Sequence, residues 1–257
     1  GSCGGERTVM RSGLAMGGPE RYHWVSVAAK RRLPGGRRRT HAPFAAAAAP
    51  FPRWEELVDR CASTLHTTLD DAARASVRGW LERLQRWSER IDLTAARNPE
   101  ELVDLILADA LFLAQRIPGG ATRIVDVGSG AGGPGLGLAL VREELRVTLV
   151  EPNGKRASFL RTVVGALGRT NVAIERVHGE SLANRRAWDV AVSRATFAPA
   201  AWLALGATLV EPGGRVVVLL AREPPPDFAH ASVESDESYV WPLTGAKRRA
   251  VVYRVPG

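Results

Sequence analysis

The chain has 257 residues, of which 45% are hydrophobic, a size and composition typical of one globular α/β domain, alone or with a small appendage. No run of about 18 apolar residues occurs, so the sequence predicts no membrane span. The two cysteines, Cys3 and Cys61, exclude a disulfide framework and a cysteine-based metal site. We therefore expect a cytoplasmic protein without a metal.

The formal net charge of +8 belongs entirely to the N-terminal segment. Residues 1–53 hold ten of the 35 basic residues and two of the 27 acidic ones, and the remainder holds 25 of each sign. Proline, glycine, an alanine run and clustered arginines give residues 1–52 no periodic apolar face, so we expect a disordered or loosely attached tail. It could be a nucleic-acid-binding arm, a transit peptide, or an over-extended reading frame.

Residues 53–118 are expected to form a helical cap. Asn98 is a typical helix N-cap, Pro99 suits the first turn, and Glu100 and Glu101 favour the positive end of the helix dipole. In the preceding segment, apolar side chains recur at the three- and four-residue steps of a helix: Val77, Trp80, Leu81, Leu84, Trp87 and Ile91.

Residues 119–257 alternate strand and helix patterns, which predicts a mostly parallel, Rossmann-like α/β sheet with helices on both faces. The segments "ESYVWPL" and "RRAVVYRV", separated by "TGAK", predict a closing antiparallel hairpin. Strands are expected at 122–127, 146–151, 171–176, 188–193 and 214–221, and helices at 135–143, 154–168 and 199–210.

A glycine-rich turn follows the first of these strands. Gly128, Gly130 and Gly133 satisfy the dinucleotide pattern G-x-G-x-x-G, which is weak evidence by itself. Asp126 and Gly132 extend the pattern to D-x-G-x-G-x-G. An acid pointing into the crevice would repel the pyrophosphate of NAD and would suit the ammonium and sulfonium groups of S-adenosylmethionine. The loop therefore favours S-adenosylmethionine over a dinucleotide or a phosphate.

The ends of the next strands supply further cofactor candidates. Glu151 ends the second strand, 25 positions after Asp126, where a carboxylate can accept both ribose hydroxyls. Glu180, Ser181 and Leu182 follow the third strand, where an adenine ring would be held. An acid or a backbone N–H of this segment could bind the edge of the adenine, and Leu182 could pack on the face of the ring. Ser193 and Arg194 end the fourth strand, beside the expected position of the methyl group.

Several stretches resemble the bacterial 16S ribosomal RNA guanine-N7 methyltransferases, the glucose-inhibited division protein B family. They are "LQRWSERIDLTAARNPEE", "DVGSGAGGPGLGLAL", "LVEPNGKRASFLRTVVGALG", "SRA" and "EPGGRVVVLLARE", in this order. The resemblance implies a class I methyltransferase fold, S-adenosylmethionine as cofactor, and 16S RNA or the small ribosomal subunit as partner of a monomer. It places cofactor contacts on Gly128, Gly133, Ser181, Leu182 and Arg194.

The mechanism implied needs no general base, because guanine N7 is an unprotonated lone pair and no proton leaves during its methylation. Positioning of the nucleophile and the methyl group can supply roughly 7–11 kcal/mol of the acceleration. Arg194 is therefore interpreted as a positioning residue. An arginine donor aimed at N7 itself would compete with methylation.

The half expected to face the substrate departs from the family pattern. The family has asparagine at Asp92, a bulky residue at Gly133, "R-H-x-x-D-S" where residues 105–110 read "LILADA", and "L-K-G" where residues 221–223 read "ARE". A paralogue that methylates a small molecule or a protein, a non-catalytic RNA- or cofactor-binding module, and an NAD-linked enzyme therefore stay open as alternatives. The substrate-contact candidates are Asp109, Lys155, Arg156 and Arg222.

Overall fold

The computed structural model describes residues 53–257, and the predictions for the tail, residues 1–52, lie outside this range. A seven-stranded sheet has the order β3-β2-β1-β4-β5-β7-β6. Neighbours from β3 to β5 pair in parallel, and β7 pairs antiparallel with both β5 and β6. The predicted Rossmann-like sheet and its closing hairpin are confirmed. The strands are β1 (Arg123–Val127), β2 (Arg146–Val150), β3 (Val172–Glu175), β4 (Trp188–Ser193), β5 (Val210–Leu220), β6 (Ser232–Val240) and β7 (Lys247–Arg254).

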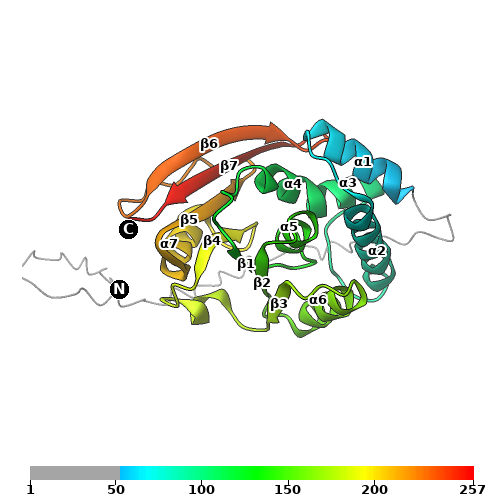
Figure 1. The fold of residues 1–257 in the computed structure, drawn as a ribbon, viewed down its shortest axis with the longest axis horizontal. Helices are drawn as coiled ribbons and strands as arrows, with labels where there is room; N and C mark the ends of the chain where they lie inside the picture. Colours follow the sequence, from blue (N-terminus) through cyan, green and yellow to red (C-terminus); the bar gives the residue numbers. More distant parts are fainter. Residues whose placement is uncertain (1–52) are drawn as a thin grey trace, which may run out of the picture. The chain divides into compact units, whose positions relative to one another are not determined.

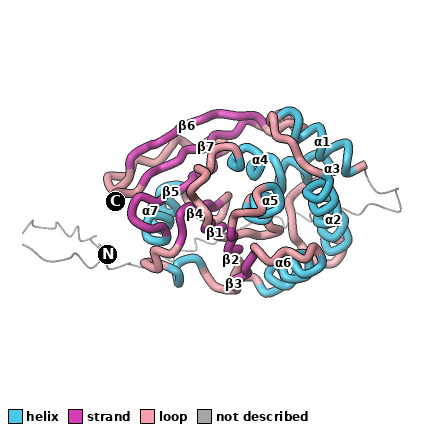
Figure 2. The backbone as a smooth tube through the Cα atoms, in the orientation of Figure 1, coloured by secondary structure: helices cyan, strands magenta, loops and turns pink. Residues whose placement is uncertain are grey.

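Helices cover both faces of the sheet unequally. Figure 1 shows α7 on one side of β4 and β5, and α2, α4, α5 and α6 on the other. Figure 2 shows the other α-helices gathered away from α7. The helical elements are α1 (Trp54–Thr64), α2 (Asp71–Ser88), α3 (Pro99–Val103), the π-helical turn η1 (Asp104–Ala108), α4 (Asp109–Ala114), α5 (Gly135–Val141), α6 (Gly154–Ala166), the 3-10 turn η2 (Gly179–Leu182) and α7 (Pro199–Leu209).

The N-terminal helices share a hydrophobic core with the sheet. Trp80 of α2 is fully buried and belongs to the same cluster of apolar side chains as Leu149 of β2 and Val192 of β4. Its indole Nε1 donates a hydrogen bond to the carbonyl of Ala131, 3.0 Å away in the glycine-rich turn. The predicted apolar stripe of α2 thus braces the turn. The division into two domains at residue 118 stays a prediction.

One helical run extends from Pro99 to Ala114 and contains the π-helical turn η1. As expected, the Asn98 side chain caps its start by accepting a hydrogen bond from the Glu101 N–H at 2.8 Å. A π turn inserts one residue into a helix and rotates the side chains that follow it. Two acids of this run, Asp104 and Asp109, are buried, with 0% and 1% of their surface exposed.

The fifth strand begins earlier than expected. β5 starts at Val210, although the sequence pattern predicted a start at residue 214. Glycines at 213 and 214 weaken the strand pattern, and Gly213 has φ of +78°, a backbone conformation that glycine adopts without strain. Among residues 53–257, no helix is long and apolar enough to cross a membrane.

Candidate active site at the carboxyl edge of the sheet

The predicted site residues follow the carboxyl ends of β1, β2, β3 and β4. These strands are adjacent and parallel, so their following loops meet at one edge of the sheet. The strand order reverses between β1 and β4, because the chain runs outward from β1 to β3 and then returns to the other side of β1. Ligands of open α/β sheets bind in the crevice at such a switch point.

Two glycines of the turn adopt the left-handed backbone conformation beside this crevice. Gly128 has φ of +79°, and a Cβ atom there would lie 2.1 Å from Oγ1 of Thr196, which follows β4. Gly130 has φ of +57°, and a Cβ atom there would meet only the Gly128 carbonyl, at 3.9 Å. The backbone of β1 thus approaches the loop after β4 more closely than any side chain would allow. Together they form a narrow cradle of bare peptide groups.

The other two predicted glycines face the protein instead. A Cβ at Gly132 would lie 2.9 Å from the Trp80 ring, and one at Gly133 would lie 3.0 Å from backbone atoms of Leu105 and Ile106. Their predicted cofactor contacts could therefore come only from backbone atoms, and they stay predictions. Their small size lets the turn pack against α2 and η1. This packing also gives a reason for Gly133 where the resembling family has a bulky residue.

Asp126 does not point into the crevice, which corrects the expectation of an exposed acid there. It is fully buried beneath the turn, and its Oδ2 accepts a hydrogen bond from the N–H of Gly135, the first residue of α5, at 2.9 Å. A Cβ at Gly135 would lie 2.6 Å from the Asp126 Cβ, so only glycine permits this approach. Burial raises the pKa of Asp126 to about 7, although the Gly135 N–H opposes the shift.

The second oxygen of Asp126, Oδ1, is buried and has no hydrogen-bond partner among the described residues. A buried acceptor without a donor is costly, and such groups are rare outside functional sites. This orphaned atom belongs to a residue near the end of β1, two positions before Gly128. Its unused acceptor capacity would suit a hydrogen-bond donor, such as a water molecule or an ammonium group.

Glu151 lies where it was predicted, immediately after β2. It is 4% exposed, its Oε2 accepts the N–H of Gly130 at 2.9 Å, and its Oε1 accepts the N–H of Asn153 at 2.8 Å. A carboxylate has about four lone-pair directions, so each oxygen retains capacity for one more donor. Two backbone bonds fix its orientation, which is the arrangement that would hold two vicinal ribose hydroxyls.

The segment after β3 forms the turn η2. Glu180 and Ser181 are exposed, and the Ser181 hydroxyl donates to the carbonyl of His178 at 2.7 Å. Leu182 has no exposed surface and packs in the core beneath α7. The prediction that its side chain covers an adenine ring is therefore wrong, because the 3-10 turn directs it inward. Gly179 sits against β1, where a Cβ would lie 2.4 Å from Val127.

A buried polar network lies beside the end of β4. The Arg194 guanidinium donates to the carbonyl of Leu105 and to Oδ2 of Asp109, which is 3.1 Å away. The other oxygen of Asp109 accepts the Tyr239 hydroxyl and the Trp241 indole N–H, both at 2.6 Å. Burial and the Asp109 charge raise the pKa of Tyr239, so it stays a neutral donor. Asp109 therefore holds Arg194 in place, and its predicted contact with the substrate stays a prediction, since Asp109 also lines the cavity described next.

Next to Arg194 lies a cavity of about 220 Å³. Its wall includes Ala195, whose φ of +54° is a conformation that non-glycine residues rarely adopt and that concentrates at functional sites. The other wall residues come from the helical run before β1, from the segment after β4, from the end of β5 and the residues after it, and from the β6–β7 hairpin. The full lining is Leu105, Asp109, Arg194, Ala195, Phe197, Pro199, Leu219, Leu220, Ala221, Glu223, Trp241 and Arg248.

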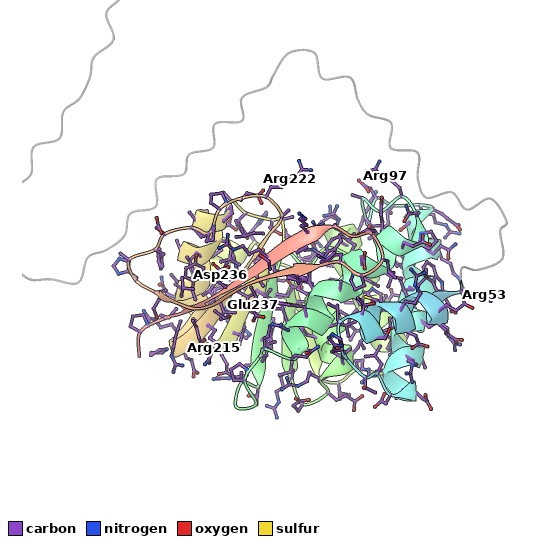
Figure 3. All side chains as sticks on the ribbon, turned by 90° about the horizontal axis from the view of Figure 1, so that it is seen from above. Arg53, Arg97, Arg215, Arg222, Asp236 and Glu237 are labelled. Atoms are coloured by element: carbon purple, nitrogen blue, oxygen red, sulfur yellow. The ribbon has the colours of Figure 1, made fainter. Side chains whose placement is uncertain are left out.

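Three basic candidates lie outside this cavity. Lys155 is exposed and Arg156 half-buried at the start of α6, where the Asn153 side chain caps the helix. Arg222 follows β5. Figure 3 shows Arg222 and Arg97 projecting outward on the same side of the molecule. Arg97 precedes α3, and its side chain is 86% exposed beside Glu101.

Four residues that the structure brings to the site were missed from the sequence: Tyr239, Trp241, Glu223 and Arg248. The first two stand in the segment read as one strand of a hairpin, where an aromatic residue is ordinary β-strand composition. Their polar atoms could have indicated a buried acceptor nearby, because a buried phenol or indole group requires a hydrogen-bond acceptor. Among residues 53–257, no group of three or more His, Cys, Asp or Glu side chains could hold a metal ion.

The chain matches known proteins over most of this region. The family model "rRNA small subunit methyltransferase G" matches residues 74–239. A protein of Xanthomonas axonopodis pv. citri with the name "Ribosomal RNA small subunit methyltransferase G" is 37% identical over 162 residues, covering 63% of this chain and 76% of that protein. Its namesake from Halorhodospira halophila is 36% identical over 190 residues, covering 72% and 89%. The namesake from Myxococcus xanthus is 34% identical, covering 67% and 84%.

These matches confirm the resemblance stated from the motifs and, with it, the expected class of enzyme, an S-adenosylmethionine-dependent methyltransferase. The match includes most of α2, the glycine-rich turn, Glu151, Arg194 and most of β6, up to Tyr239. The chain belongs to the small-subunit ribosomal RNA methyltransferase G family.

Proposed function

We propose that this protein transfers the methyl group of S-adenosylmethionine to N7 of a guanine in 16S ribosomal RNA. The observation that carries the proposal is the pairing of a bare-backbone cradle at Gly128 and Gly130 with the fixed carboxylate of Glu151. When bound, S-adenosylmethionine supplies an electrophilic methyl group on a sulfonium. The cytoplasm and a monomeric state are part of the same proposal, since the curated relatives are bacterial proteins named for ribosomal RNA.

The residues of the crevice fit this cofactor. Glu151 would accept the ribose hydroxyls, since two backbone N–H groups already orient its carboxylate. The peptide groups of Gly128 and Gly130 would lie against the methionine part, where a side chain would interfere. Glu180 and Ser181 are exposed after β3 and remain the candidates for the adenine edge.

Arg194 would position the reacting groups without taking a proton. Its side chain is 20% exposed, and its guanidinium is held by Asp109 and the Leu105 carbonyl. A fixed cation near the end of β4 cannot act as a general base, and N7 methylation needs none. Its contribution would come from orientation, which accounts for a large share of catalysis in reactions without proton transfer.

RNA would approach the carboxyl edge of the sheet, on the side from which Arg97 and Arg222 project (Figure 3). Exposed arginines bind phosphates irrespective of sequence, and each contact adds to the salt dependence of binding. Lys155 and Arg156, at the start of α6, are further candidates at this edge.

The test is methyl transfer from labelled S-adenosylmethionine to small-subunit RNA, with mass spectrometry of nucleosides. We expect 7-methylguanosine as the product. Arg222→Glu should weaken RNA binding and reduce its salt dependence, whereas Arg146→Glu should not, because Arg146 is exposed at the opposite, amino end of β2. Methylation of another nucleoside, or of no RNA at all, would refute the proposal.

A further inference from the structure

The cavity beside Arg194 has the size and composition of a pocket for a single base. Its volume of about 220 Å³ falls below the roughly 300–1,000 Å³ of pockets that enclose drug-sized ligands. Leu105, Phe197, Leu219 and Trp241 supply apolar walls, and charged groups stand at a few points. A flat aromatic ring with polar edges matches this lining better than a chain or a phosphate does.

The order of the strands orients this cavity relative to the cofactor cradle. The glycine-rich turn follows β1, Arg194 and Ala195 follow β4, and Ala221 and Glu223 follow β5. Since β4 lies between β1 and β5, and neighbouring strands are about 4.8 Å apart, the Glu223 side of the cavity lies farther from the cradle than the Arg194 side does. A base whose reacting atom faces the methyl group would present its opposite edge to Glu223.

Glu223 is an exposed carboxylate at the wall of the cavity that accepts hydrogen bonds from two neighbouring backbone N–H groups. Its Oε2 accepts the N–H of Arg222 at 3.1 Å and the N–H of Ala221 at 3.3 Å. Hydrogen bonds from backbone N–H groups lower the pKa of this carboxyl group, and that of Arg222 has the largest effect. The acid stands where the resembling family carries glycine, so this contact would be a property of the present chain.

We propose that Glu223 selects guanine by accepting hydrogen bonds from the N1–H and the N2 amino group of the target base. The inference rests on the proposed function and adds the residue that reads the base. When guanine N7 faces the methyl donor, its N1 and N2 donors point the other way, toward the β5 side. Adenine would present the N1 lone pair to the carboxylate and be repelled. The anion would also stabilise the positive charge that develops on guanine as N7 is methylated.

Arg248 and Trp241 form the neighbouring wall. The Arg248 guanidinium carbon lies 3.7 Å from the centroid of the Trp241 ring, a cation–π contact. Because the Trp241 indole N–H is held by Asp109, the ring is fixed in two directions. It would set the plane of the bound base, while Glu223 reads its edge.

The experiment compares RNA containing the methyl-accepting guanine with the same RNA containing inosine there, which lacks only the N2 amino group. For the unmodified protein we expect kcat/KM to be about tenfold or more lower with inosine, as for the loss of one hydrogen bond to an anion. In Glu223→Ala the guanine-to-inosine ratio should approach one, and in Glu223→Gln it should fall between. Asp227→Asn is the matched control, an exposed acid of the same loop outside the cavity lining.

The outcomes separate the two proposals. If the unmodified protein forms 7-methylguanosine but Glu223→Ala keeps the full guanine preference, the base-reading proposal is overturned and the proposed function stands. The same holds if inosine and guanine are methylated equally by the unmodified protein. If no small-subunit RNA is methylated, the proposed function fails and this inference fails with it. A purely structural change at Glu223 would lower kcat/KM equally for both RNAs and leave their ratio unchanged, which also overturns the proposal.

Discussion

Arg194 and Asp109 lie 85 positions apart in the sequence and form an ion pair with 3.1 Å between Nη1 and Oδ2. Asp109 is 1% exposed and also accepts hydrogen bonds from Tyr239 and Trp241. One carboxylate thus joins α4, the end of β4 and the hairpin strand β6 with its following residue. The position of Arg194 thus depends on a buried acid whose two oxygens are both occupied by hydrogen bonds.

Removing this acid should destabilise the protein strongly. Asp109→Ala removes the counter-charge of a half-buried guanidinium and leaves a phenol and an indole N–H without their acceptor, and breaking such a buried pair costs roughly 3–5 kcal/mol. Chemical unfolding measures the loss. Asp59→Ala is the control, because its ion pair with Arg74 is exposed and typically contributes under about 1 kcal/mol. Comparable small losses in both variants would contradict the network.

Gly128→Ala should weaken cofactor binding at least tenfold. The added methyl group would meet Thr196 Oγ1 at 2.1 Å, and φ of +79° strains any other residue. Calorimetric titration with S-adenosylhomocysteine measures the affinity. Gly168→Ala is the control for strain alone, because Gly168 has φ of +62° but no atom within 4 Å of its Cβ position. We expect it to lower stability by about 1–2 kcal/mol and to leave the affinity unchanged.

Thr196→Ala added to Gly128→Ala separates crowding from backbone strain. The double variant removes two of the three crowding atoms, so it should recover part of the lost affinity. An affinity equal to that of Gly128→Ala alone would mean that backbone strain, and not steric contact with Thr196, causes the loss of cofactor binding.

Glu151→Gln should raise the dissociation constant of S-adenosylhomocysteine roughly 10- to 100-fold, since hydrogen bonds to a charged acceptor contribute about 1.5–3 kcal/mol. The amide can replace only one of the two acceptor oxygens that hold the Gly130 and Asn153 N–H groups. Glu175→Gln is the matched control, because Glu175 ends the next strand and pairs with Arg185 outside the crevice. Equal affinities for both variants would remove Glu151 from the cofactor site.

The stability of the cofactor-free protein should depend on pH through Asp126. Its pKa is raised to about 7 in the folded state, against about 3.9 in an unfolded chain. The folded state therefore binds more protons between these values, and the stability falls as the pH rises from about 4 to 7, by up to about 4 kcal/mol, and then levels off. Asp126→Asn cannot ionise, so its stability relative to the unmodified protein should rise over this window. A pH-independent difference between the two proteins would exclude an ionisable Asp126 with a raised pKa.

The frame of the fold and part of the site could be predicted because their signals are local. The glycine-rich turn, the start of α6 and Glu151 lie within about one turn of a strand end, so strand periodicity alone places them at the carboxyl edge. The same reasoning fails where direction matters. Asp126 and Leu182 were assigned to the correct segments, but the pleat of β1 and the 3-10 turn after β3 direct their side chains into the interior.

The Asp109 network could not be predicted, because its contacts join residues 85 to 132 positions apart. Nothing in the sequence near Asp109 indicates that a hairpin from the C-terminal end covers it. The π turn at Asp104–Ala108 could not be predicted either, because apolar residues lie on both sides of it and a regular α-helix would show the same sequence pattern.

The closing hairpin also determines when the helix from Pro99 to Ala114 can fold into place during synthesis. Asp104 receives its donors from Leu243 and Thr244, and Asp109 receives two of its donors from Tyr239 and Trp241. During synthesis, N-terminal segments emerge first. More than a hundred further residues must therefore be synthesised after Asp104 and Asp109 before these partners exist. Until then they must remain hydrated, and the helix from Pro99 to Ala114 cannot dock in its final position. A nascent chain arrested before β6 should therefore keep this helix open to solvent, and synthesis of the β6–β7 hairpin would convert a hydrated surface into the wall of the crevice.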